Sequence, residues 1–63
     1  MKKLTINGFE VKLYPKIYPQ LCEKDDAWIE EQIVSTMKRL TVPMTLKGLY
    51  TGAKAVEEEL AGS

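Results

Sequence analysis

The sequence predicts an α+β fold in which an N-terminal two-stranded antiparallel β-hairpin is followed by two antiparallel helices, in the order ββαα. The first observation is the pair Asn7-Gly8, which lies between two short runs of alternating apolar and polar residues. Asn-Gly is the strongest two-residue hairpin signal, because a type I′ turn needs a positive φ at both central positions. The second observation is that the later part of the chain carries two apolar stripes at helical spacing, separated by a proline.

The predicted hairpin covers residues 3–14. Closing the strands on the Asn-Gly turn sets the cross-strand pairs, which are Ile6 with Phe9, Leu4 with Val11, and Lys2 with Leu13. Because successive side chains of a strand point to opposite faces, the apolar residues then share one face. We expect the helices to cover that face.

An extended linker is predicted over residues 14–23, which contain two Tyr-Pro pairs four residues apart. Proline lacks an N–H donor and restricts the residue before it, so this stretch suits neither a helix nor a central strand. We expect Ile17 and Leu21 to anchor the linker to the core.

Two helices are predicted, over residues 25–41 and 45–61. Asp25 or Asp26 suits the N-terminus of the first helix, and Thr45 suits the N-cap of the second. The connection between them is short, so the helices should be neighbours in space. The apolar stripes and the apolar hairpin face give the predicted core, which consists of Leu4, Ile6, Phe9, Val11, Leu13, Ile29, Ile33, Met37, Leu40, Leu46, Leu49, Ala53, Val56 and Leu60.

The composition predicts one small domain over residues 1–63, with no catalytic, metal or cofactor chemistry. Lys plus Arg and Asp plus Glu number 9 each, so the formal net charge is zero. No apolar run approaches the roughly 20 residues of a membrane span. The chain has no histidine, and its one cysteine, Cys22, fits a reducing compartment, so we expect a cytoplasmic location. Neighbouring carboxylates such as Glu30 and Glu31 diverge on a helix, so we expect no enzyme.

A first surface for a protein partner is predicted on the first helix. Trp28, Gln32 and Arg39 share a face that lies off the apolar stripe. Trp and Arg are frequent among interface hot spots. The alternative is that Trp28 packs against the Tyr-Pro linker or the hairpin edge.

A second surface is predicted on the second helix. Gly48, Gly52 and Ala55 form a smooth strip opposite the apolar stripe, where another backbone could approach closely. Each glycine costs roughly 1 kcal/mol relative to Ala in a helix interior, so a packing partner would account for them. The alternative is a weak helix that faces solvent.

These features predict a small protein–protein interaction module, an inhibitor or modulator that acts by occluding a partner surface. Proteins of this size and charge are frequent among the accessory proteins of phages and mobile elements. We expect a homodimer or a complex with a protein partner of unknown identity, because so small a core is only marginally stable alone.

The alternative function is a dimeric DNA-binding regulator of the helix-turn-helix or ribbon-helix-helix type. In that case the second helix would offer Thr45, Lys47, Thr51 and Lys54 to the major groove. The chain departs from both motifs. Ribbon-helix-helix proteins carry a single strand before their helices, and helix-turn-helix motifs often place Gly in the turn that here holds Pro43. The balanced charge also favours the interaction module.

Overall fold

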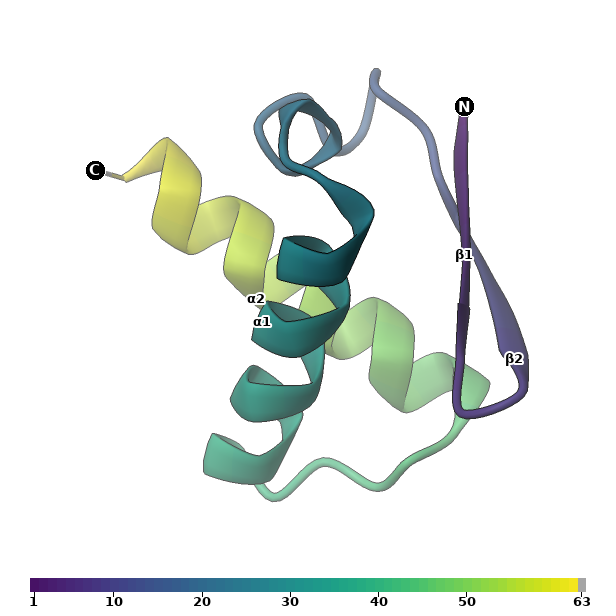
Figure 1. Ribbon diagram of the computed structural model, residues 1–63. Coiled ribbons are helices and arrows are strands. Elements are labelled where there is room, and N and C mark those ends of the chain that lie inside the picture. Colours follow the sequence, from purple (N-terminus) through teal and green to yellow (C-terminus); the bar gives the residue numbers. More distant parts are fainter. Residues whose placement is uncertain (63) are drawn as a thin grey trace.

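The computed structural model describes residues 1–62 and has the predicted ββαα order (Figure 1). Strands β1 (Lys2–Ile6) and β2 (Phe9–Leu13) form the hairpin, and a short 3-10 helix, η1 (Leu21–Glu23), follows. Helices α1 (Asp26–Arg39) and α2 (Leu46–Ala61) complete the fold. The α+β fold class is therefore confirmed. The last position of the predicted domain, residue 63, lies outside the described residues.

The hairpin has the predicted register and turn. The strands are antiparallel, with Ile6 opposite Phe9 and Leu4 opposite Val11. Asn7 and Gly8 have φ values of 51° and 84°, as a type I′ turn requires. The strands lie within one residue of the predicted bounds.

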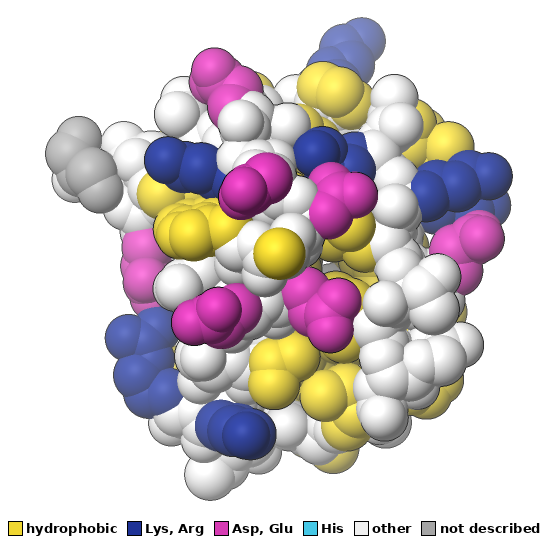
Figure 2. All heavy atoms as spheres, in the orientation of Figure 1, with side chains coloured by type: hydrophobic (Ala, Val, Ile, Leu, Met, Phe, Trp, Pro, Cys, Tyr) yellow, Lys and Arg dark blue, Asp and Glu magenta, His cyan; other side chains and the backbone are white. Residues whose placement is uncertain are grey.

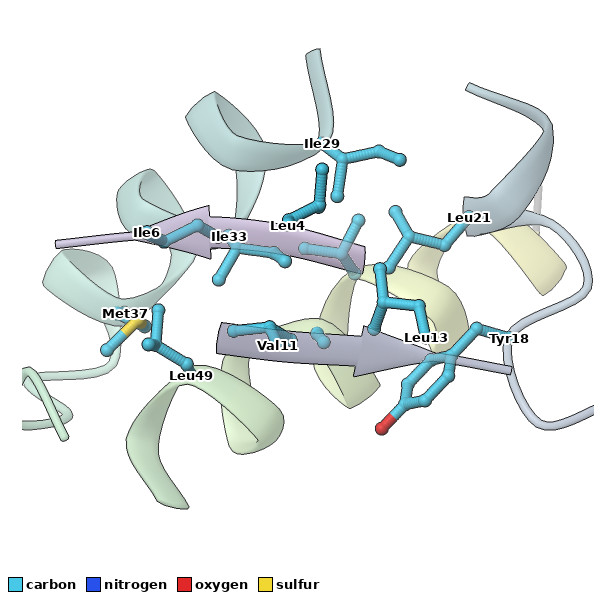
Figure 3. Close-up of a cluster of buried hydrophobic side chains, with 12 residues drawn as sticks. Leu4, Ile6, Val11, Leu13, Tyr18, Leu21, Ile29, Ile33, Met37 and Leu49 are labelled. Carbon is cyan, nitrogen blue, oxygen red and sulfur yellow. The ribbon is translucent and has the colours of Figure 1, made fainter. Parts of the chain in front are cut away.

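The core lies between the hairpin and the helices. Figure 3 shows apolar side chains of both strands directed toward side chains of α1 and α2. Those from the strands are Leu4, Ile6, Val11 and Leu13, and those from the helices include Ile29, Ile33, Met37 and Leu49. All of these were predicted, as were the buried Ala53 and Val56.

Four predicted core residues are not fully buried. Phe9 and Leu60 are half-buried, whereas Leu40 and Leu46 remain 47% and 43% exposed. The prediction for Leu40 and Leu46 is wrong because both lie at helix ends. Leu40 follows the last residue of α1, and Leu46 is the first residue of α2, so both lie beyond the part of each stripe that the rest of the fold covers.

The linker is turned rather than extended. The carbonyl oxygen of Tyr14 accepts hydrogen bonds from the N–H groups of Ile17 at 2.9 Å and Tyr18 at 2.8 Å. Pro15 occupies the second position of this turn, which its fixed φ favours. Each proline restricts the tyrosine before it, but the residues between the two pairs are free to turn.

Tyr18 and Leu21 attach the linker to the core, where both are buried. The prediction for Leu21 is confirmed, and the prediction for Ile17 is wrong, because that side chain is 63% exposed. Tyr18 was interpreted as a packing residue but was not part of the predicted core. The turn directs it inward, in place of Ile17.

Helix α2 holds both the linker and the hairpin through polar side chains. The buried carboxylate of Glu57 accepts hydrogen bonds from the N–H groups of Leu21 at 2.8 Å and Gln20 at 3.1 Å, at the start of η1. The hydroxyl of Tyr50 accepts the N–H of Lys12 in β2 at 2.8 Å. Because a buried backbone N–H left without an acceptor is costly, the bond to Leu21 fixes the linker against α2, and the exposed bond from Lys12 adds a link to the strand.

Helix α2 begins as predicted. Thr45 is its N-cap, and the Oγ1 atom of Thr45 accepts the N–H of Gly48 at 3.0 Å. Helix α1 also begins at the predicted position, after Asp25, although no side chain makes the capping hydrogen bond there.

The prediction that Gly48 and Gly52 lie on an open strip is wrong, because both are buried and Ala55 is half-buried. A Cβ atom at Gly48 would clash with the carbonyl oxygen of Pro43, and one at Gly52 would lie 2.8 Å from the Cγ atom of Met37. The close approach that the glycines permit is therefore to the loop before α2 and to α1. Helix α2 buries two flanks, one against the hairpin and one against α1, and its apolar stripe marks only part of that area.

This packing predicts that Gly48→Ala lowers the free energy of unfolding by about 2 kcal/mol, because overpacking against backbone costs roughly 1–3 kcal/mol. Gly52→Ala should also lower it, by about 1 kcal/mol, because the new Cβ atom would lie 2.8 Å from the Cγ atom of buried Met37 and 3.2 Å from the carbonyl oxygen of Ile33, which outweighs the better helix propensity of alanine. Urea denaturation of both variants provides the measurement. A Gly48→Ala variant as stable as the wild type would contradict this packing.

Candidate functional site

The most distinctive surface of the molecule is the turn between the two helices, residues 40–46, which we call the corner. Six large apolar side chains are exposed among the described residues, and three of them, Leu40, Met44 and Leu46, belong to this short segment. Met44 is 36% exposed and was not predicted to have any role. Because large apolar side chains grouped on a surface mark interaction sites more often than scattered ones do, the corner is the leading candidate.

Backbone hydrogen bonds at the end of α1 fix the first half of the corner. The N–H of Val42 donates to the carbonyl oxygen of Met37 at 2.8 Å. The N–H of Thr41 donates to the carbonyl oxygen of Lys38 at 3.2 Å. These two bonds form a Schellman motif, which ends the helix two residues before the predicted limit.

Thr41 takes the position in this motif that glycine usually occupies. Its φ is 54°, in the left-handed region, which costs a β-branched residue about 1–2 kcal/mol. The Thr41 hydroxyl donates to the carbonyl oxygen of Leu40 at 2.6 Å. The turn is therefore held by its surroundings despite an unfavourable residue at its centre.

A shallow open groove of about 330 Å³ lies beside the exposed apolar side chains. Its lining combines the loop with the first turns of α2, namely Val42, Pro43, Thr45, Lys47, Gly48 and Thr51. The hydroxyls of Thr45 and Thr51 both bond to the backbone of α2, since Thr45 accepts from Gly48 and Thr51 donates to the carbonyl oxygen of Lys47 at 3.0 Å. The Lys47 ammonium is thus the cation available to a ligand in this groove.

The surface predicted around Trp28 is engaged within the chain. Trp28 is half-buried and packs against the core, and the ammonium of Lys24 lies 5.3 Å from the centre of its ring. Gln32 is half-buried, and Arg39 forms an ion pair with Glu59 of α2. These contacts agree with the alternative in which Trp28 packs, and a role in partner binding for this face stays a prediction.

The residues predicted for nucleic-acid contact are all exposed. Lys47, Thr51 and Lys54 follow one another at spacings of four and three, which places them on one outward face of α2. Thr45 and Thr51 meet Lys47 at the groove. The structure therefore brings this set together, next to the corner.

Charge is distributed unevenly over the molecule. Between Glu31 and Glu57 the chain contains no Asp or Glu, and its charged side chains there are Lys38, Arg39, Lys47 and Lys54. Figure 2 shows acidic side chains over the middle of the face that carries α1, with basic side chains beside them and around the margin. The corner therefore lies in the basic part of the chain.

The groups whose pKa is shifted lie away from the corner. Burial raises the pKa of Tyr18, and Tyr50 and Glu57 act in the same direction. Burial also raises the pKa of the Cys22 thiol, which donates to the carbonyl oxygen of Leu13 at 3.5 Å. A raised pKa keeps the thiol protonated and weakens it as a nucleophile.

Within residues 1–62, no group of three or more His, Cys, Asp or Glu side chains is placed to hold a metal ion. None of the helices in this range has the length and apolar character needed to cross a membrane. The chain matches no protein-family model, and no curated protein and no solved structure is significantly similar to it. The geometry of the corner is therefore the basis for assigning a function.

Sequence reasoning missed the corner because two of its three apolar residues fit the helical stripes. The signal that could have found it is the proline between the helices. A loop that holds Pro43 interrupts both stripes, so the apolar residues on either side of it, Leu40 and Leu46, need not face the core.

The conformation of Thr41 predicts that Thr41→Gly raises the free energy of unfolding by about 0.5–1 kcal/mol, since glycine adopts a positive φ without steric cost. The matched control is Thr51→Gly, in the interior of α2, which should lower it by roughly 0.3–0.5 kcal/mol. Thermal or urea unfolding measures both. A loss of stability in Thr41→Gly would show that the turn is not left-handed in solution.

Proposed function

We propose that this protein is a non-enzymatic protein–protein interaction module that docks on a partner through the corner and acts by occluding the partner's surface. The observation that carries the proposal is the grouping of Leu40, Met44 and Leu46 as exposed side chains within a single turn. The proposal keeps the function class that the sequence predicts and moves the docking surface from Trp28 and the glycines to the corner.

Rigidity of the corner supports this function. The Schellman hydrogen bonds hold Thr41 and Val42, and a hydrogen bond of 2.9 Å joins the N–H of Thr45 to the carbonyl oxygen of Pro43. A turn that is already ordered loses little conformational entropy when a partner binds, so more of the binding free energy is retained. Apolar side chains on such a turn suit a docking surface.

Burial of the exposed apolar area on a partner would also contribute favourable binding free energy. Removing a half-exposed leucine from water is worth about 1 kcal/mol, at roughly 25 cal/mol per Å² of apolar surface. The three apolar side chains of the corner together supply a centre for an interface, and the polar residues Thr45 and Lys47 supply part of a rim.

A second candidate function is DNA binding through α2. The observation that favours it is the shared outward face of Lys47, Thr51 and Lys54, next to the N-terminus of the helix. Helix α1, the corner and α2 would then correspond to a helix-turn-helix. Two lysines provide few phosphate contacts, so this function ranks below the interaction module.

Site-specific photocrosslinking tests the interaction module. A photoreactive amino acid at Met44 should give a discrete crosslinked product with another protein in the cells that make this chain. The product should fall about thirtyfold in the Leu40→Ser/Leu46→Ser variant, because two leucines lose about 1 kcal/mol each on the interface. Both leucines are exposed, so the variant should remain folded.

The control places the same photoreactive group at Ile17, which is more exposed than Met44 and lies in the linker. The Ile17 position should give no discrete product. Equal crosslinking from both positions, or a product that is unaffected by the leucine substitutions, would contradict docking at the corner.

The DNA-binding candidate predicts a salt-dependent affinity for a labelled duplex in a fluorescence anisotropy titration. Two phosphate contacts correspond to about a tenfold loss of affinity between 50 and 200 mM salt. Lys47→Glu/Lys54→Glu should abolish binding, and Lys16→Glu in the linker should leave it unchanged. Absence of binding at 50 mM salt would remove this candidate.

A further inference from the structure

We infer that the partner segment seated on the corner is an acidic stretch of polypeptide that carries apolar side chains. This inference rests on the proposed function, because it names the chemistry of the partner that the corner selects. Its basis is the combination of three exposed apolar side chains with flanking charges of one sign. The sequence of the corner itself, residues 40–46, contains no charged residue.

The charges that flank the corner are basic on both sides. Lys38 and Arg39 end α1 just before it, and Lys47 follows Leu46 at the start of α2. Arg39 is neutralised by Glu59, whereas Lys38 and Lys47 take part in no ion pair among the described residues. A docked segment therefore meets two unneutralised cations.

The nearest acidic residues along the chain, Glu31 and Glu57, form no ion pair with these cations among the described residues, although Glu31 lines one surface hollow together with Lys38. Glu57 is buried, with both carboxylate oxygens bonded to the linker backbone. Glu10 of the hairpin lies 3.9 Å from the ammonium of Lys12. A carboxylate brought by a partner would consequently find an unpaired lysine, and opposite charges at an interface rim speed association and select the partner.

The groove limits the size of what can be inserted. Its volume of about 330 Å³ lies at the lower end of the range for small-ligand sites, roughly 300–1,000 Å³. Its lining includes the apolar residues Val42 and Pro43 together with Lys47. One or two apolar side chains next to a carboxylate match this lining.

Two other occupants fit the charges less well. A second copy of the chain, bound by the same surface about a two-fold axis, would bring Lys38 and Lys47 toward the same cations of its partner. A nucleic acid would meet the lysines but would leave Leu40, Met44 and Leu46 without apolar cover. An acidic polypeptide segment with apolar side chains satisfies both features of the corner.

Selection from a displayed library of random peptides tests the inference. The wild-type protein is the bait, and the Leu40→Ser/Leu46→Ser variant is used to remove peptides that bind elsewhere. The enriched peptides should combine Asp or Glu with large apolar residues. Lys38→Glu/Lys47→Glu should weaken binding of a purified enriched peptide about tenfold, and Lys16→Glu should leave it unchanged.

The outcomes separate the inference from the proposed function. Enriched peptides that depend on the leucines but are neutral or basic would overturn the inference and leave docking at the corner standing. Loss of every binding peptide when the pool is depleted on the leucine variant would count against the proposed function itself. Light scattering on the same proteins gives a further outcome, because a dimer that the leucine substitutions dissociate would identify a second copy as the occupant and overturn the inference.

Discussion

The contact between Gly48 and the carbonyl of Pro43 is the constraint on which the rest of this structure depends. Only a residue without a side chain lets the loop backbone approach the first turns of α2 so closely. This contact packs the start of α2 against the loop that follows α1. One turn later, Gly52 makes a similarly close approach to Met37 and Ile33 of α1. The position of α2 then determines where Tyr50 meets the hairpin and where Glu57 meets the linker.

The same contact explains why the corner projects from the molecule. The loop between the helices is short, and the Schellman turn at Thr41 ends α1 early, so the chain must reverse within a few residues. Pro43 turns its carbonyl toward α2, and the side chains of Leu40 and Met44 stay exposed. The tight junction between the helices therefore leaves apolar surface exposed at the corner, and the proposed docking on a partner would bury that surface.

The sequence was most informative where local chemistry decides the structure. Asn7-Gly8 predicted the hairpin, its register and one face of the core, because the turn type and the period-two pattern agree. Thr45 predicted the start of α2, because its hydroxyl can bond to the backbone three residues ahead. These features involve residues that are close along the chain or are paired by a fixed register.

Prediction failed where a residue's surroundings come from distant parts of the chain. Helical spacing placed Gly48 and Gly52 on an outer strip opposite the apolar stripe. Spacing within one helix does not show that α1 covers that flank of α2. The same spacing placed Leu40 and Leu46 in the core because it does not show where the rest of the fold stops covering the end of a helix. Burial of Tyr18 depends on a turn that the Tyr-Pro pairs permit but do not specify.

The close approach of α2 to the loop can be observed directly in a two-dimensional NOESY spectrum of the protein in solution. The structure predicts cross-peaks from an α-proton of Gly48 to a methyl group of Val42, and from an α-proton of Gly52 to the side chains of Ile33 and Met37. The α-protons of Thr5 and Glu10, a directly opposed pair in the hairpin, supply an internal reference. A spectrum with the hairpin cross-peak but without those of the two glycines would contradict the central packing.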